Sequence, residues 1–166
     1  STQDLVHPRV ECEIAFFTNA DLHGPNCTAK DVMAATDYVV PALEIIDSRF
    51  SGFKFDLPSV IADNGSSARY VPGKQHFSPT AFDLTKIAVS LKKNGEEKAA
   101  GASDAVLGNP AIAIAMLVNL LSEQGEHLPG GSFVMSGAIT EAIPAQAGDT
   151  FCATFAGMGE VSINFA

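Results

Sequence analysis

The chain has 166 residues, of which 46% are hydrophobic and 17% are charged, and its formal net charge is −9 at pH 7. This length and composition predict one domain with an ordinary hydrophobic core. The acidic balance argues against nucleic acid and against anionic membrane surfaces as partners. No window is expected to reach the length of a membrane span. Three cysteines without paired spacing suggest free thiols in a reducing cytoplasm.

The predicted elements are mostly strands. Apolar periodicity and turn residues place, in chain order, a strand over 9–17, a short helix over 29–36, a strand over 38–48, a strand leading into a polar turn over 60–71, a hairpin over 87–101, a long helix over 110–124 between Pro110 and Gly125, and strands over 132–140, 148–157 and 160–166. Seven or more strand-like runs against one long helix predict an α+β, mainly β domain with a mixed, rolled or barrel-like sheet.

Local signals mark several of these elements. Thr28, with Asp31 three residues later, is typical of a helix start. The dipeptide Asn94-Gly95 between two strand-like runs indicates a hairpin turn. Pro41 interrupts the second strand and indicates an edge strand or a bulge.

Two acids stand inside the first apolar strand. Glu11 and Glu13 are two residues apart, and alternate residues of a strand point to the same side, so both carboxylates share one face. A solvated strand face would explain this pair by itself. Glu44, which also lies in an apolar run, adds a third oxygen donor. Three carboxylates on apolar strands suit Mg²⁺ or Mn²⁺, and they predict a metal site.

Two further polar clusters offer candidate site residues. Asp63 and Ser66 lie in the turn-forming stretch ADNGSSARY, where Asp63 could act as a general acid or base or simply form the turn. Ser136 and Thr140 lie in SGAIT, which could bind a carboxylate through hydroxyl and backbone N–H groups. An ordinary strand and turn explains SGAIT equally well.

An ordered set of segments resembles the fumarylacetoacetate hydrolase superfamily, in its hydratase and decarboxylase branch. These segments are HPRVECEIAF, YVVPALEIIDSRF, ADNGSSARY, VLGNP and SGAITEAIPAQAGD, and together they cover nearly the whole chain. The resemblance implies the superfamily's C-terminal-like fold. It also implies that Glu11, Glu13 and Glu44 hold the metal, with Mg²⁺ as the usual ion and Mn²⁺ as a possible substitute.

The resemblance implies one of two activities. FKFDL, the Arg-Tyr pair that ends ADNGSSARY and the run LVHPRVE are similar to enzymes that decarboxylate 2-oxo-3-hexenedioate (4-oxalocrotonate) to 2-hydroxypenta-2,4-dienoate. VLGNP points the other way, because decarboxylases of this branch usually have His where Asn109 stands. The expected function is therefore the metal-dependent decarboxylase of meta-cleavage aromatic degradation, with 2-hydroxypentadienoate hydratase as the alternative.

A small 2-oxo dicarboxylate is the expected substrate, and such a dianion needs a cation in so acidic a protein. Lys54 and Arg69 are the candidates, although both could be ordinary surface cations. We assign expected catalytic roles to Asp63, Ser66 and Lys54. Substrate binding is assigned to Arg69, and to Ser136 and Thr140 in the SGAIT stretch.

Residues 1–166 are expected to form a single catalytic domain, the C-terminal part of a longer chain. The resemblance implies a preceding segment with an active-site lysine, which this sequence lacks. It also implies a cytoplasmic homo-oligomer, with a possible complex with a partner hydratase. A different class of protein stays open, namely a non-catalytic module that binds metal or forms oligomers.

Overall fold

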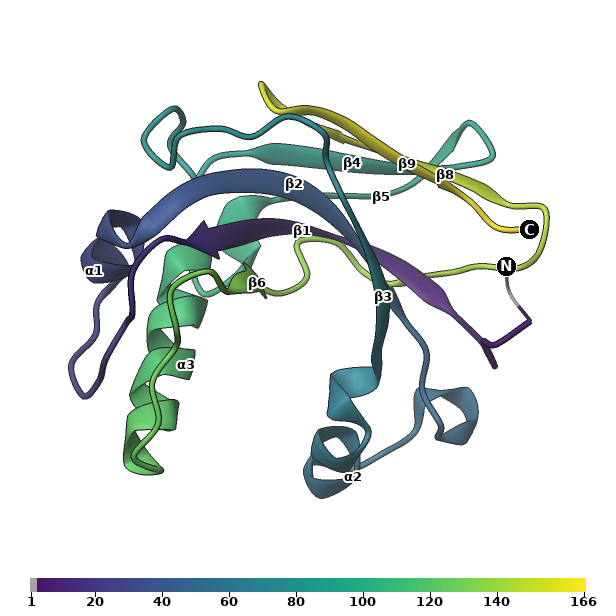
Figure 1. The fold of residues 1–166 in the computed structure, drawn as a ribbon. Coiled ribbons are helices and arrows are strands. Elements are labelled where there is room, and N and C mark those ends of the chain that lie inside the picture. The colour runs from purple at the N-terminus through teal and green to yellow at the C-terminus, as the bar shows by residue number, and fades with distance from the viewer. Residues whose placement is uncertain (1–2) are drawn as a thin grey trace.

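The computed structural model describes residues 3–166, which form two antiparallel β-sheets and three α-helices (Figure 1). The first sheet has the order β3-β2-β1-β6, with β7 also pairing with β1, and the second has the order β5-β4-β8-β9. The strands are β1 (Arg9–Thr18), β2 (Thr36–Ile46), β3 (Ser67–Pro72), β4 (Ala88–Lys93), β5 (Glu96–Ala102), β6 (Phe133–Met135), β7 (Ile143–Pro144), β8 (Thr150–Phe155) and β9 (Gly159–Asn164). The helices are α1 (Ala29–Ala34), α2 (Leu57–Ala62) and α3 (Pro110–Glu123). The predicted mainly β fold with one long helix is confirmed.

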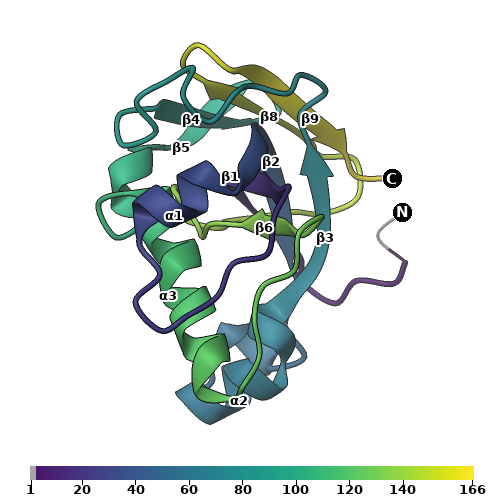
Figure 2. The same cartoon turned by 60° about the vertical axis from the view of Figure 1, so that its left-hand side comes forward.

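The side chains of β1 alternate between two environments. Val10, Cys12 and Ile14 are fully buried in the core that the two sheets share. Glu11 and Glu13 occupy the alternate positions and point to the other face. Figures 1 and 2 show the second sheet on one side of β1 and β2, with α2 and α3 projecting on the opposite side. The acids therefore lie on the face of the first sheet that the second sheet does not cover.

Several local predictions are confirmed. The long helix spans Pro110–Glu123, and the Asn109 side chain caps it by accepting a hydrogen bond from the Ala111 N–H at 2.9 Å. The hairpin joins β4 and β5 through Asn94 and Gly95, which both have positive φ angles, as a tight hairpin turn requires.

The prediction of a strand that begins at residue 60 is wrong, because Leu57–Ala62 is a helix. Asp56 starts this helix by accepting a hydrogen bond from the Ser59 N–H at 3.0 Å, and Pro58 occupies its first turn. The apolar run of Val60 and Ile61 therefore belongs to a helix, and the strand of this region begins only at β3.

The strand predicted over 132–140 is also too long, since β6 ends at Met135. Gly137 has a φ of +116°, which turns the chain out of the extended conformation. This break brings the Gly137 N–H to the side chain of Glu13. The interruption of the strand thus contributes a donor to the face that carries the acids.

Pro41 lies in a central strand rather than in the edge strand or bulge that was predicted. Its carbonyl accepts a hydrogen bond from the Gly73 N–H at 2.7 Å. The N–H and C=O of one strand residue point to the same side. The side of β2 on which Pro41 lacks an N–H is therefore the side of Gly73, just beyond the end of β3, and not the side of β1. The ladder between β1 and β2 is therefore not interrupted.

The apolar segment Ser103–Glu123 is long and apolar enough, by length and composition, to cross a membrane. The expectation that no segment reaches such a length is therefore wrong. In this fold Ala111, Ile114 and Val118 on one side of α3 are buried in the core. The opposite side leaves large apolar side chains exposed, namely those of Ile112, Met116, Leu117 and Leu120.

Candidate metal centre

The register of β1 and β2 brings three glutamates together. Glu11 lies directly opposite Glu44, and Glu13 is two residues further along the same face. One carboxylate oxygen from each of the three lies within 4.8 Å of the other two. The structure thus assembles the three acids that the sequence singled out, although their role as metal ligands stays a prediction.

The electrostatics of these acids are unfavourable without a cation. Burial raises the pKa of Glu13 to about 9, and the negative charge of Glu44 adds to this, although the Gly137 N–H, 2.7 Å from Glu13 Oε2, acts in the opposite direction. Burial and the neighbouring Glu44 also raise the pKa of Glu11 to about 7. The metal-free site therefore retains protons at neutral pH.

The donor set fits a hard divalent cation. Three carboxylates supply oxygen ligands of the kind that Mg²⁺ and Mn²⁺ prefer, and they leave room for water or substrate. No lysine or arginine among residues 3–166 forms an ion pair with them. Ser136, next to the Gly137 that contacts Glu13, has a buried Oγ without a hydrogen-bond partner among those residues. A bound cation with its waters would neutralise the acids and could offer this hydroxyl a partner.

An aromatic wall stands beside the acids. Tyr70 of β3 pairs with Glu44 and so lies on the same face, and its ring stacks on that of Phe133 at a centroid distance of 5.1 Å. Ala15 and Ala42 are buried on this face and pack with Phe133. The Phe133 ring, which packs on these small residues, and the Tyr70 ring stacked on it make an apolar surface suited to a planar ligand. Sequence reasoning missed Tyr70 because only the pairing of β3 with β2 reveals its position.

Arg9 is a cation that the sequence analysis also missed. It precedes Glu11 by two residues on β1 and therefore shares its face. The guanidinium carbon lies 4.3 Å from the centroid of the Phe53 ring, which is a cation–π contact. The same two-residue spacing that identified the acids could have identified Arg9.

Asp63 and Ser66 belong to a buried network at the end of α2. The hydroxyls of Ser48 and Ser66 each donate to Asp63 Oδ2 at 2.8 Å, and the Arg49 side chain forms an ion pair with Asp63 Oδ1. Burial alone would raise the pKa of Asp63, but these hydrogen bonds, led by the one from Ser66, lower it to about 2. A carboxylate held this firmly is a weak base and a poor proton donor. Its surroundings point to an anchor for the turn rather than to the predicted catalytic role.

We expect Asp63→Asn to lower the melting temperature by several degrees, because the substitution removes a charge that the side chains of Ser48, Arg49 and Ser66 and the Arg49 backbone N–H surround. The exposed residue Asp37 provides the matched control, and Asp37→Asn should leave the melting temperature unchanged. Circular dichroism melts of both variants test this. A variant Asp63→Asn that melts like the wild type but has lost turnover would return Asp63 to the catalytic machinery.

The two predicted cations are not brought to the acids. Arg69 pairs with Ile45, whose side chain is buried in the core, so Arg69 and Glu44 lie on opposite faces of the sheet. Lys54 is exposed at the end of the turn Ser51–Phe53 and forms no ion pair among residues 3–166. Neither placement supports the substrate contact that was predicted for these residues.

The two residues predicted from SGAIT lie against β1. Thr140 Oγ1 accepts a hydrogen bond from the Cys12 N–H at 3.2 Å, which continues the pairing of β1 where β6 has ended. Ser136 is buried beside Gly137 and keeps its hydroxyl free of protein partners among the described residues. Of the two, Ser136 has the hydroxyl that is still available to a ligand.

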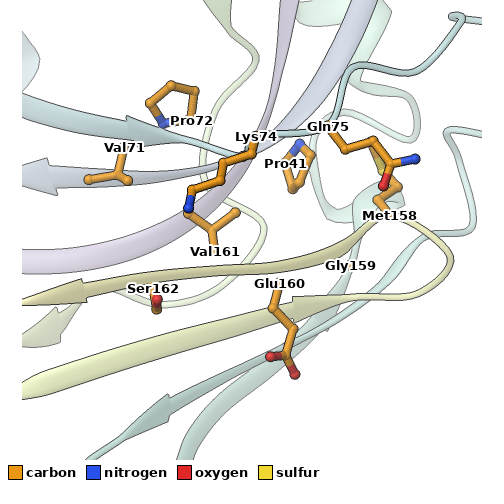
Figure 3. A pocket seen from close by; sticks show the side chains of 11 residues that line it. Pro41, Val71, Pro72, Lys74, Gln75, Met158, Gly159, Glu160, Val161 and Ser162 are labelled. Carbon is orange, nitrogen blue, oxygen red and sulfur yellow. The ribbon is translucent and has the colours of Figure 1, made fainter.

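A hollow of about 460 Å³ lies elsewhere, between the end of β3 and the start of β9 (Figure 3). Pro41, which lines it, pairs with Ile14 and so takes the opposite face of β2 from Glu44. Figure 3 shows Lys74 reaching across the hollow, while the side chain of Glu160 points away from it. This hollow contains none of the predicted site residues, and it is not the candidate site.

Comparison with known proteins places this geometry in a family. No protein-family model matches the chain. The chain is 51% identical over 164 residues to a 4-oxalocrotonate decarboxylase of Pseudomonas sp. (strain CF600), covering 99% of this chain and 62% of the relative. It is 43% identical over 161 residues to a 2-hydroxyhexa-2,4-dienoate hydratase of Comamonas testosteroni, covering 97% of this chain and 61% of that protein.

Solved structures of the same family share the fold of this chain. The 4-oxalocrotonate decarboxylase from Pseudomonas putida G7, complexed with magnesium and adipate, superposes with a TM-score of 0.97 at 48% identity, over 99% of this chain and 63% of that one. Fumarylpyruvate hydrolase from Pseudomonas aeruginosa shares the fold, with a TM-score of 0.70 at 14% identity, over 99% of this chain and 68% of that one. The chain spans about three fifths of the length of the curated relatives that it matches. It belongs to the fumarylacetoacetate hydrolase superfamily, in the branch of hydratases and decarboxylases.

Proposed function

We propose that the protein decarboxylates 2-oxo-3-hexenedioate to 2-hydroxypenta-2,4-dienoate with a divalent metal, Mg²⁺ or Mn²⁺, at Glu11, Glu13 and Glu44. The observation that carries the choice of reaction is the order of similarity. Two decarboxylases are 51% and 50% identical to the chain, above the 43% of the hydratase of Comamonas testosteroni, while a third decarboxylase is 39% identical. The magnesium and the dicarboxylate adipate in the P. putida G7 decarboxylase support the same reaction.

The reaction breaks the bond between C5 and C6 of the substrate and releases CO₂. The bonding electrons pass through the adjacent double bond toward the 2-oxo oxygen, and protonation yields the dienol product. When bound, the metal is a Lewis acid that stabilises negative charge at the 2-oxo group. Glu13 is positioned for its role as a ligand by the Gly137 N–H, which fixes one of its carboxylate oxygens.

The chain's other contribution is to hold a flat substrate. The stacked rings of Tyr70 and Phe133 and the small side chains of Ala15 and Ala42 present an apolar surface next to the acids. Such a surface excludes water from one side of the conjugated system and keeps it planar, which aligns the breaking bond with the double bond.

Arg9 is the proposed partner of the second carboxylate, in place of Arg69 and Lys54. On a strand, residues two apart are separated by about 6.6 Å, which is close to the span between the two carboxylates of a six-carbon diacid. Arg9 shares the face of Glu11 and is held by Phe53. A cation on a departing carboxylate stabilises the bound substrate more than the transition state, so its contribution is to binding.

We expect Arg9→Gln to raise KM for 2-oxo-3-hexenedioate about tenfold or more, with a smaller change in kcat, since a charged hydrogen bond to substrate is lost. The matched control is Arg69→Gln, on the opposite face, which should leave KM unchanged. Steady-state kinetics of the full-length protein measure both. An unchanged KM in Arg9→Gln, or a raised KM in Arg69→Gln alone, would contradict this assignment.

The alternative function is hydration of 2-hydroxypentadienoate, which the 43% identity to a hydratase favours. An assay of the full-length protein with each substrate, with and without Mg²⁺, separates the two. We expect Mg²⁺-dependent CO₂ release from 2-oxo-3-hexenedioate that exceeds any hydration of 2-hydroxypentadienoate. Hydration without decarboxylation would overturn the proposal. If the assay detects neither activity, the result would favour the non-catalytic module.

Assembly and location stay predictions from the family resemblance. A homo-oligomer would give the exposed apolar side of α3 a partner. Light scattering of the full-length protein tests this, and a monomeric mass would count against it. The complex with a partner hydratase and the cytoplasmic location likewise stay predictions.

A further inference from the structure

Two loops outside the proposed active site carry a second cluster of metal-binding side chains. The loop after β1 contains Asp21 and His23, and the loop between α3 and β6 contains His127. The two loops pair through Leu22 and Leu128, whose backbone groups exchange hydrogen bonds of 2.8 and 3.0 Å. One ligand atom from each member of this Asp-His-His cluster lies within 4.8 Å of the other two.

The pairing itself explains why these side chains meet. In an antiparallel pair, the position next to a doubly hydrogen-bonded residue pair is the one where opposite side chains approach most closely. His23 and His127 occupy this position, and their rings stack at a centroid distance of 4.7 Å. Asp21 is two residues before His23 and so projects to the same side.

A backbone hydrogen bond fixes the orientation of the Asp21 side chain. Its Oδ1 accepts a hydrogen bond from the Gly130 N–H at 2.8 Å, and its Oδ2 lies 3.8 Å from His127 Nε2. One oxygen of this carboxylate is held by a backbone N–H, and the other faces an imidazole. Metal-binding carboxylates are commonly oriented in this way, with one oxygen free for the metal and the other hydrogen-bonded to the protein.

The two loops are rigidly joined on both sides of the cluster. The Thr18 carbonyl accepts a hydrogen bond from the Gly131 N–H at 2.7 Å, and Thr18 Oγ1 accepts one from the Ser132 N–H at 3.0 Å. A Cβ at Gly130 would lie only 3.1 Å from the backbone of Ala20, so a larger residue would push the two segments apart by a few tenths of an ångström. On the α3 side, the Asn119 side chain bonds both backbone groups of Cys27, at 2.8 and 2.9 Å. The backbone positions of the ligands are therefore set before any metal binds.

We propose that Asp21, His23 and His127 form a binding site for a transition-metal dication of the Zn²⁺ class. Imidazole suits Zn²⁺ and Co²⁺ and not Mg²⁺, so this site differs in ion preference from the three-glutamate site. Ligand atoms around tetrahedral zinc are about 3.3 Å apart. The three ligand atoms here lie within 4.8 Å of one another, and rotation of these partly exposed side chains would bring them to the shorter separation. The ion would join the segment after β1 to the segment after α3, and water would fill its open positions.

The test is a Co²⁺ and Zn²⁺ titration of the full-length protein in excess Mg²⁺, which occupies the glutamate site. We expect one tightly bound Co²⁺ per chain with visible absorption bands, and a higher melting temperature when Zn²⁺ is added. His127→Asn and His23→Asn should each weaken binding at least about tenfold and abolish the Zn²⁺-dependent rise. His76→Asn, at an exposed histidine elsewhere, and Glu13→Gln, at the glutamate site, should retain both.

Binding that survives in both His127→Asn and His23→Asn would overturn the proposal. So would the absence of any Co²⁺ bound in excess Mg²⁺. Melts of the two variants without metal show whether they fold as the wild type does. Should one fail to fold, the other together with Asp21→Asn gives the same comparison.

Discussion

Glu13→Gln should abolish Mg²⁺-dependent turnover of the full-length protein, by about a thousandfold or more, while the protein still folds. The substitution keeps the shape of the side chain and removes one of three charges that a hard dication prefers. A thousandfold loss corresponds to about 4 kcal/mol of transition-state stabilisation. The metal-free variant should be at least as stable as the wild type, because repulsion from Glu44 and the cost of burying the charge are both relieved.

Isothermal titration with Mg²⁺ and steady-state kinetics measure the effect, and Glu141→Gln, at an exposed glutamate outside the site, is the matched control. A structural acid would show a different pattern, with a lower melting temperature accompanying any loss of activity. Wild-type turnover of Glu13→Gln at limiting Mg²⁺ would remove Glu13 from the site.

The second large effect concerns pH. The folded-state pKa values of Glu11 and Glu13, about 7 and about 9, lie above their ordinary value of 4.5. At pH values between the ordinary pKa and the raised ones, the folded state therefore binds more protons than the unfolded state. The metal-free protein consequently loses stability as pH rises from about 5 to about 9. Each pKa unit corresponds to about 1.4 kcal/mol. Mg²⁺ replaces the protons, so its stabilising effect should grow over the same range.

Melting curves between pH 5 and pH 9, with and without Mg²⁺, test this prediction. Glu13→Gln should flatten the dependence of the metal-free protein on pH. Asp63 does not interfere, because its lowered pKa of about 2 confines its contribution to acid below pH 4. A Mg²⁺-induced shift that is constant or falls between pH 5 and pH 9 would contradict the proposed site.

The sequence predicted those parts of the fold that depend on local chemistry. The long helix was predicted from Pro110 at its start and Gly125 beyond its end, and the hairpin from Asn94 and Gly95, and both are found. The apolar run before Asp63 looked like a strand, although Asp56 and the following Pro58 are the signature of a helix start. The local signal for a helix was therefore present in the sequence, but the strand prediction followed the apolar pattern instead.

The site was predictable to the extent that it lies on one strand. Glu11 and Glu13 share a face by alternation alone, whereas the place of Glu44 beside them depends on the register of β1 and β2, which the structure shows. Its apolar surroundings and the family resemblance had pointed to Glu44, but neither gave that register. The positions of Tyr70 and Arg69 depend on a further pairing, between β3 and β2. Register is a long-range property, and a shift by one residue exchanges the two faces, so the sequence alone did not show that Tyr70, rather than Arg69, lies on the face of the acids.

The central claim is that three glutamates from two paired strands hold one divalent cation. Anomalous diffraction from a crystal of the protein grown with Mn²⁺ tests it directly. We predict one strong anomalous peak bounded by carboxylate oxygens of Glu11, Glu13 and Glu44, at about 2.1 to 2.2 Å from each. A peak that lacks Glu44, or no manganese on this face of the sheet, would contradict the account.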